Sequence, residues 1–482
     1  MKSLNRKTAN AGQVYREKVV QFGAGNFLRA FADWVIDSLN KQAGFAGSVV
    51  AIKVSPRRSV PNVYESLDAQ DGLYHLVLTS SEDGQAVSKT QLISSVSRTV
   101  NPYLDDAAFR GLARQPEIRF IISNTTEAGI RFEPMDRLDD RPPSSFPGKL
   151  TAFLYERFLH FEGQAERGCI ILPCELIEDN GAALQRCVLN YAELWKLGEP
   201  FIAWLDVANY FCNTLVDRIV PGFPHERAAD IQAEIGFVDP LLVEGESYHS
   251  WIIEAPEIVR AEFPADTIGL NVKFVTDATR YRELKVRILN GAHTSMVMVG
   301  YLHGLRSVRE AVEDELVGRF VHNLLYKEVL PALDFPAAEK EQMANDVLQR
   351  FKNPFLHHKL MAISLNSTAK FKARLLPSLL DYAERSGQPP QRICLAFAAL
   401  TLFYKGEWNG MPIELNDDQV VLEWWKGIWA ADVTAEARVA HVLRNQTIWG
   451  QDLTKVSGLQ TQITAYLKQL EQNGIDIVLA QI

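Results

Sequence analysis

The segment that most constrains the fold is a short apolar strand that runs through two glycines into a helical pattern. Residues 18–22 read Lys-Val-Val-Gln-Phe, Gly23-Ala-Gly25 follows, and apolar residues at helical spacing cover 31–39. In such a turn the glycines let the backbone approach a pyrophosphate, and the helix N-terminus attracts its charge. Leu28 stands at the third glycine position of the usual pattern, so an ordinary strand–helix turn is the alternative. The pattern predicts dinucleotide binding.

More buried strands follow, separated by helical patterns. Apolar, β-branched runs at 48–54, 118–123 and 168–173 predict strands of a parallel sheet, and 70–100 has the alternation of a β-meander. The run at 118–123 opens into a polar loop, the place where open α/β sheets bind ligands. The cofactor contacts expected at these strand ends are Phe22, Gly23, Gly25, Asn26, Phe27, Thr126 and Glu127.

From about residue 180 strands become rare, and helical spacing dominates apart from a short β segment at 268–275. A chain of 482 residues exceeds what one hydrophobic core usually supports. We therefore expect an α/β N-terminal Rossmann-like doubly wound sheet plus a mostly α-helical C-terminal domain. The expected boundaries are 1–275 for dinucleotide binding and 276–482 for substrate binding and catalysis.

The charge balance bears on the partners. Lys and Arg number 50 against 59 Asp and Glu, a formal net charge of -9, which argues against nucleic acid or an anionic membrane as the main partner. The five cysteines include no Cys-x-x-Cys pair, and the N-terminus lacks the apolar core of a signal peptide. These features favour a cytoplasmic protein with a small-molecule substrate.

The end of the second strand bears on cofactor choice. An NAD-binding unit usually carries Asp or Glu there to hold the ribose hydroxyl. This chain instead continues Val54-Ser-Pro-Arg57-Arg58, and the two arginines suit a 2′-phosphate. A solvated basic turn is the alternative, so the choice between NAD and NADP stays open at this point.

Three polar side chains share one side of the helix expected over 280–300. At about 100° per residue, Lys285, Asn290 and His293 fall within an arc of roughly 140°, which also contains Arg282. Burial and a neighbouring cation would ease proton loss from the lysine, as a general base requires. A solvated lysine and a histidine satisfied within the core are the alternative for this pattern alone.

A metal site is not expected. The ten histidines are scattered, and His357-His358 is not a usual ligand spacing. The chain also lacks a Gly-x-Ser-x-Gly elbow and a Walker loop.

Taken together, the motifs resemble those of the polyol-specific long-chain dehydrogenase/reductase family, the mannitol dehydrogenases, over nearly the whole chain. Seven ordered motifs carry the resemblance: Gly23-Ala-Gly25-Asn-Phe-Leu-Arg-Ala30, Gln70-Asp71-Gly72-Leu73-Tyr74, Thr126-Glu127-x-Gly129, Asp179-Asn180-Gly181, Asn213-x3-Asp217-Arg218-Ile219, Lys285-x4-Asn290-Gly-x-His293 and Arg350-Phe-x-Asn353-Pro354.

The resemblance implies a zinc-free hydride transfer with Lys285 as general acid/base. It places Asn180 and Asn290 as donors to the reacting oxygen, and His293 as a group that binds substrate or orients the lysine. For Asn180 a helix N-cap is an alternative that is compatible with that role. A sensor that binds a dinucleotide without catalysis is a further alternative, but such a protein would have no need to keep Lys285, Asn290, His293 and Asn180 together.

Three further residues concern substrate binding. The resemblance implies Lys370 as a contact from the C-terminal domain, with a solvated lysine as the alternative. For Asp217 a structural ion pair with Arg218 or a contact with a helix end competes with substrate binding. Arg282 is also a candidate, and a surface pair with Glu283 is its alternative.

Two departures from the mannitol-type pattern bear on the substrate. Arg282 stands where those members carry glutamate, and Ala362 stands where they carry arginine. A cation at 282 suits a substrate carboxylate. The resemblance thus implies NAD(H)-dependent reduction of D-tagaturonate to D-altronate, with fructuronate or mannitol-type activity as the alternative. It favours a monomer, although a homo-oligomer is possible.

Overall fold

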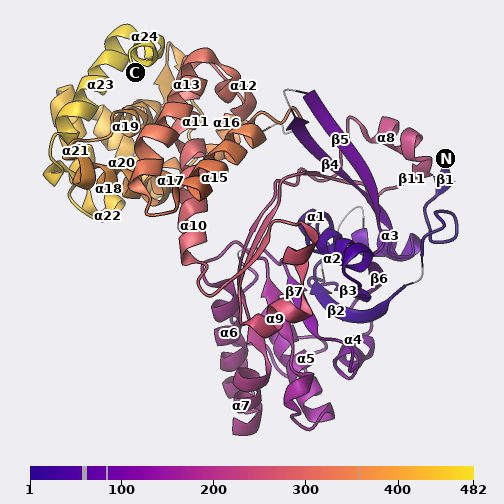
Figure 1. Ribbon diagram of the computed structural model, residues 1–482. Helices are drawn as coiled ribbons and strands as arrows, with labels where there is room; N and C mark the ends of the chain where they lie inside the picture. Colours follow the sequence, from indigo (N-terminus) through magenta and orange to yellow (C-terminus); the bar gives the residue numbers. More distant parts are fainter. Residues whose placement is uncertain (13, 57–61, 83–84, 127, 356–357) are drawn as a thin grey trace. The chain divides into compact units, whose positions relative to one another are not determined.

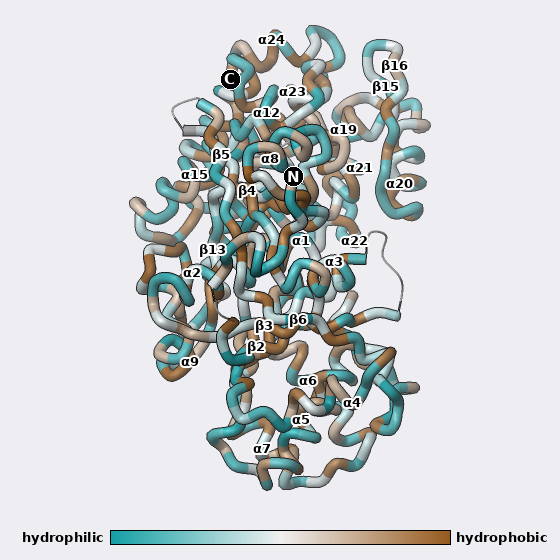
Figure 2. Tube along the Cα trace, turned by 90° about the vertical axis from the view of Figure 1, so that its right-hand side faces the viewer, coloured by the Kyte–Doolittle hydropathy of each residue, from teal (hydrophilic) through white to brown (hydrophobic). Residues whose placement is uncertain are grey.

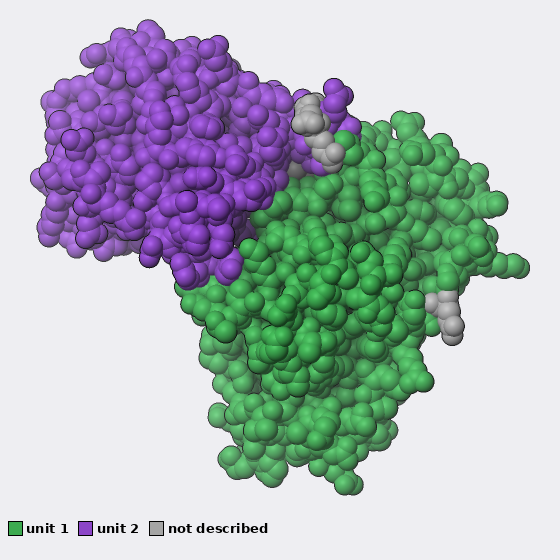
Figure 3. Space-filling model, viewed as in Figure 1, with its two compact units in different colours: residues 1–79, 87–279 green, residues 80–86, 280–482 purple. Residues whose placement is uncertain are grey.

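The computed structural model describes residues 1–12, 14–56, 62–82, 85–126, 128–355 and 358–482. The chain divides into two compact units, which Figure 3 colours separately. The first comprises residues 1–79 and 87–279, and the second comprises residues 80–86 and 280–482. The boundary at 279/280 lies four residues from the expected one at 275/276, and residues 80–86 are grouped with the second unit.

The first unit is built on a six-stranded sheet in which all neighbouring strands are parallel. Its spatial order β6-β3-β2-β7-β8-β9 reverses direction between β2 and β7, which is the switch point where doubly wound sheets bind their ligands. The predicted Rossmann-like sheet is confirmed. The strands are β2 (Arg16–Phe22), β3 (Gly47–Ile52), β6 (Val96–Val100), β7 (Phe120–Ser123), β8 (Ile170–Pro173) and β9 (Tyr210–Phe211).

Successive residues of the central strands face opposite sides of this sheet. Val19 of β2 packs in one apolar cluster with residues of α2 (Ala32–Gln42), whereas Val20 and Phe22 pack in a second cluster. That second cluster contains residues of α4 (Asp106–Ala113), α5 (Phe146–His160), α6 (Asn180–Leu194) and α7 (Glu199–Ala208) (Figure 1). Because both faces are covered, all six residues of β3 and the last four of β2 are buried; Figure 2 colours the chain by hydropathy and labels both strands.

Strands beyond residue 180 are more numerous than the single β segment expected. Two three-stranded sheets have the orders β10-β13-β14 and β12-β4-β5. Most of these strands are only four or five residues long, too short for alternation to distinguish them from loops. Those beyond residue 180 are β10 (Asn213–Asp217), β12 (Val243–Glu246), β13 (Ser250–Glu254) and β14 (Val272–Val275). The other two, β4 (Tyr74–Glu82) and β5 (Gln85–Ile93), lie within the β-meander expected at 70–100.

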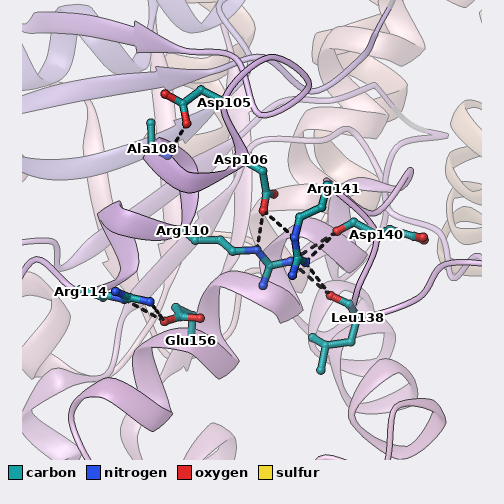
Figure 4. A network of polar contacts seen from close by, with 9 residues as sticks. All are labelled: Asp105, Asp106, Ala108, Arg110, Arg114, Leu138, Asp140, Arg141 and Glu156. Carbon is teal, nitrogen blue, oxygen red and sulfur yellow. Dashed lines mark hydrogen bonds and ion pairs between the residues drawn. The ribbon is translucent and has the colours of Figure 1, made fainter.

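The loop between β7 and α5 is fixed to α4 by a polar network (Figure 4). Asp106 Oδ2 accepts from Arg110 Nε at 2.7 Å and lies 3.3 Å from Arg141 Nε. Both guanidiniums also donate to the carbonyl oxygens of Leu138 and Asp140. This network closes the loop onto the same face of the sheet that α4 covers.

The second unit is mostly helical, as predicted. Its core includes α11 (Gly291–His303) and α19 (Gln391–Phe403), which pack against each other, and α19 also packs against α23 (Leu459–Asn473). Around them lie α10 (Thr279–Lys285), α15 (Ala337–Phe351) and α17 (Ser367–Arg374), and a short hairpin joins β15 (Glu407–Trp408) to β16 (Met411–Pro412). In the described part of the chain, no helix has the length and apolar character needed to cross a bilayer.

Candidate functional site

The turn after β2 leaves open space where a dinucleotide phosphate would approach. Gly23 has φ +110°, a conformation that favours glycine, and Gly25 is the extended residue that precedes α1 (Asn26–Ala30). A Cβ built on Gly25 would meet no heavy atom within 4 Å. The exposed glycine, the helix start and the switch point beside it fit the phosphates of a dinucleotide.

The residues around this turn differ in what they offer a cofactor. Asn26 is exposed, and its Oδ1 accepts from Arg29 Nη2 at 2.7 Å, so its carbonyl group is oriented by a buried guanidinium. Phe27 is half-buried and stacks on Phe31, with ring centroids 4.9 Å apart. Phe22 is fully buried in the core, so only its backbone can lie at a cofactor site.

The loop after β7 is held by Glu175, a residue that the sequence reasoning did not select. Its carboxylate accepts from Ser123 Oγ at 3.0 Å and from Thr125 N and Oγ1, both at 2.9 Å. Burial raises the pKa of Glu175, and these hydrogen bonds oppose the rise. Thr126 follows with φ +81°. Glu175 lies two residues after β8, which ends at Pro173, and this position at a strand end was the signal in the sequence that could have identified it.

Three predicted cofactor residues, Glu127, Arg57 and Arg58, lie outside the described residues. The strand before the two arginines, β3, ends at Ile52, two residues before the expected end at Val54. Lys53 N still donates to Val100 O at 2.9 Å beyond it.

Asn180 is a buried structural link in the first unit. It is 1% exposed, and its Nδ2 lies 3.0 Å from each of three carbonyl oxygens, those of Pro173, Glu175 and Thr214. Its Oδ1 accepts from Thr214 N at 2.8 Å. Asp179, not Asn180, is the N-cap of α6, which corrects the N-cap alternative. Donation to a substrate oxygen would require Asn180 to release one of its carbonyl partners.

Asp217 ends β10, and its neighbour Arg218 is buried. The guanidinium of Arg218 donates to Ala30 O at 2.5 Å and to Tyr248 O at 3.1 Å, and it lies 4.1 Å from the centre of the Trp34 ring. Arg218 therefore ties β10 to α1 through backbone carbonyls.

The helix carrying the predicted catalytic lysine is interrupted at the site. Lys285 ends α10, a π-turn covers Val286–Asn290, and α11 begins at Gly291. A π-turn is closed by i→i+5 hydrogen bonds, so residues five apart span little more than one turn. Lys285 and Asn290 are therefore closer in angle than the 140° expected for a regular helix. Single π-turns inside α-helices often occur at functional sites.

His293 lies one turn further, in a largely apolar and cationic setting. It is 8% exposed, and its ring lies 4.3 Å from the ring of Phe351 and 5.1 Å from that of His358, centroid to centroid. Burial, and then the charges of His358 and Arg350, hold the pKa of His293 well below its usual value. Within the described chain, its Nε2 has no hydrogen-bond partner.

Two cations of α17 belong to the same group. Lys370 Nζ donates to Ile363 O at 2.8 Å, and Arg374 Nη1 lies 3.4 Å from Thr294 Oγ1. Burial lowers the pKa of both, and the charge of Arg374 lowers that of Lys370 further. Arg374 was absent from the sequence prediction, although its position four residues after Lys370 on a helix was a usable signal.

Glu283 and Arg287 form an ion pair on α10 and the π-turn, with 2.7 Å between Oε1 and Nη1. Arg287 also lies 2.7 Å from Asp381 Oδ2. Arg282, the residue predicted to bind a carboxylate, is half-buried on α10.

The two units match two family models in the order found here. Residues 17–267 match the mannitol dehydrogenase Rossmann domain, and residues 277–471 match the mannitol dehydrogenase C-terminal domain. The chain belongs to the mannitol dehydrogenase family. The resemblance seen in its motifs is thereby confirmed.

Relatives within the mannitol dehydrogenase family match along the whole chain. A protein of Bacillus subtilis (strain 168) named altronate oxidoreductase is 46% identical over 482 residues, covering 100% of this chain and 98% of the relative. One of Klebsiella pneumoniae (strain 342) with the same name is 43% identical and covers 98% of each. The chain is an oxidoreductase that acts on a CH–OH group.

Two solved structures share the fold. A D-sorbitol dehydrogenase in substrate-free form superposes with a TM-score of 0.84 at 21% identity, covering 99% of this chain and 100% of that one. The Pseudomonas fluorescens mannitol 2-dehydrogenase, in a ternary complex with NAD and D-mannitol, gives 0.70 at 22% identity and covers 99% of each chain.

Among the residues that the structure describes, no three His, Cys, Asp or Glu side chains gather as a possible metal site.

Proposed function

We propose that this protein catalyses the reversible, NAD(H)-dependent and metal-independent reduction of D-tagaturonate to D-altronate in hexuronate breakdown. The observation that carries the proposal is the 46% identity, over the full chain, to a relative named altronate oxidoreductase. Lys285, Asn290 and His293 on one interrupted helix supply chemistry that such a reaction needs.

The reaction needs a hydride, a proton and stabilisation of the oxygen that becomes negative. A bound nicotinamide would donate the hydride to the carbonyl carbon in reduction and accept it in oxidation. Lys285 gives the proton to the carbonyl oxygen in reduction and removes it from the hydroxyl in oxidation. The amide of Asn290 donates a hydrogen bond to that oxygen, where negative charge develops. A lysine and an amide donor suffice for this task without a metal.

His293 enters this mechanism as a neutral imidazole, because burial and nearby cations disfavour its protonation. Its Nε2 has no partner in the described chain and is therefore available to a substrate hydroxyl. Lys370, with Arg282 and Asp217, is proposed to bind the remaining substrate groups. Asn180 can donate a hydrogen bond to the reacting oxygen only if it releases one of its carbonyl partners. Otherwise it links the end of β8 to the start of β10.

The cofactor is proposed to lie on the turn after β2 and the loop after β7. Gly23 and Gly25 give its phosphates access to the backbone, and Asn26 and Phe27 begin the helix there. Thr126 and Glu127 follow the neighbouring strand. NAD is proposed rather than NADP on the family resemblance.

The deciding experiment is an NADH-oxidation assay against a panel of D-tagaturonate, D-fructuronate and D-fructose. Preferred turnover of D-tagaturonate is the expected result. Preference for either other substrate would replace the proposal with fructuronate reduction or a mannitol-type activity. Tight NADH binding without turnover of any panel member would favour a dinucleotide sensor.

A further inference from the structure

His293 lies among several basic side chains. Arg350, His358, Lys370 and Arg374 all act on His293 electrostatically, and each lowers its pKa. Asp417, which acts on Lys370, is bonded to the Tyr404 hydroxyl. A half-buried guanidinium such as that of Arg374 is unfavourable unless an anion compensates its charge.

Arg374 stands out among these cations by its placement. Its helix, α17, packs against both α11 and the π-turn. The carbonyl oxygen of Arg374 lies 3.5 Å from the position that a Cβ on Gly291 would take, so its backbone lies beside the residue that follows Asn290. Its guanidinium extends to Thr294, the neighbour of His293, at a long 3.4 Å.

The pairing of other buried arginines in this unit makes the contrast clear. Arg287 is paired with both Glu283 and Asp381, and Arg392 donates to Glu328 at 3.2 Å. Arg374, in contrast, has no acidic partner among the residues that the structure describes. Most of its fork of N–H donors is thus left for a ligand.

We propose that Arg374, with Lys370 one turn before it on α17, binds the carboxylate of the sugar-acid substrate. This inference rests on the proposed function, and it adds a specificity-determining residue that the motifs did not indicate. Residues four apart lie on the same face of a helix, and the charge of Arg374 acts on Lys370. The planar guanidinium can hold both carboxylate oxygens at once, a geometry that a terminal hydroxymethyl cannot match.

Arg374→Gln is the variant that tests this role, and Lys372→Gln is its matched control. Lys372 lies on the same helix, two residues from Lys370, and its Nζ is directed towards Gly450. Arg282→Gln tests the competing cation, and Arg374→Lys retains the charge without the fork. For each variant, kcat and KM are measured for D-tagaturonate and D-fructose, with thermal unfolding as the folding control.

Arg374→Gln should raise KM for D-tagaturonate roughly ten- to a hundredfold, the loss expected for a charge-assisted hydrogen bond. Its kcat should change little, because the carboxylate is remote from the reacting oxygen. Kinetics with D-fructose should be unaltered, Lys372→Gln should behave as the wild type, and Arg374→Lys should fall between. If Arg374→Gln does not fold, the Arg374→Lys variant decides, through its KM for D-tagaturonate relative to that of the wild type.

A second measurement separates this inference from the proposed function. D-Altronate and its neutral hexitol are titrated into Lys285→Ala with NAD⁺ bound, with and without Arg374→Gln. Selective weakening of D-altronate binding supports the role of Arg374, whatever the wild type turns over. Equal weakening of both ligands, no weakening, or a loss that follows Arg282→Gln instead would overturn it. Absence of keto-uronate turnover by the wild type would count against the proposed function alone.

Discussion

The imidazole of His293 stacks on the phenyl ring of Phe351, with centroids 4.3 Å apart and ring planes inclined by 29°. Phe351 ends α15, so the stack joins two helices of the second unit and fixes the ring of His293 without using its nitrogen atoms. Nε2 consequently has no partner in the described chain. This relationship orients the imidazole for a substrate hydroxyl, while burial and nearby positive charge hold its pKa well below the usual value.

Replacing Lys285 with alanine should remove most turnover and leave NADH binding nearly intact. General acid/base catalysis contributes roughly 10²–10⁴-fold in rate, so a loss of that order is expected. Stopped-flow turnover of D-tagaturonate and fluorescence titration of NADH measure the two effects separately. Wild-type activity of Lys285→Ala at neutral pH would show that another group transfers the proton.

Exhaustive treatment with EDTA or dipicolinate should leave activity unchanged. The reason is that Lys285 transfers the proton and Asn290 stabilises the reacting oxygen by a hydrogen bond, so no zinc ion is needed to polarise that oxygen. The measurement is the initial rate before and after chelation, with metal content determined on the same samples. Activity lost on chelation and restored by zinc would require a metal site.

The enzyme should favour NADH, but with a modest margin over NADPH. The strand that ends before Ser55 lacks the usual acidic residue, and Arg57 and Arg58 follow. Arg57→Ala should therefore reduce kcat/KM for NADPH more than for NADH. A clear wild-type preference for NADPH would overturn the assignment of NAD.

The first unit should lose stability as the pH falls below about 6.5, partly through His249. Burial and the charge of Arg218 lower the pKa of His249 from 6.5 to about 4. Its Nε2 accepts from Asn271 N at 2.9 Å, which requires the neutral form. Between these two pKa values the unfolded chain binds more protons, so the free energy of unfolding decreases as the pH falls.

At pH 4 this protonation lowers the free energy of unfolding by about 3 kcal/mol, because each unit of pKa difference is worth about 1.4 kcal/mol. Denaturant unfolding at pH 7.5, 6 and 5 measures it, and His249→Gln should flatten the dependence. An unchanged slope in the variant would assign the loss to other groups.

The sequence by itself determined the two-part architecture and much of the proposed site. The run through Gly23 and Gly25 between a buried strand and a helix predicts the first βα turn, because only small residues permit its φ angle and its open surface. Apolar patterns identified the parallel strands, since their burial on both faces leaves near-continuous apolar runs. Lys285 and Asn290 were likewise proposed from their spacing on one helix.

The tertiary structure alone decided the remaining features. The π-turn after Lys285 is a hydrogen-bond shift that leaves no local residue pattern, so the angular positions around it could not be calculated from a regular helix. One of the three carbonyls around Asn180, that of Thr214, lies 34 residues away from it in the sequence. The role of Arg374 depends on which charges pack near it, and pairing with acids is set by contacts between distant helices rather than by sequence spacing. Electrostatic compensation is thus a property of the folded chain.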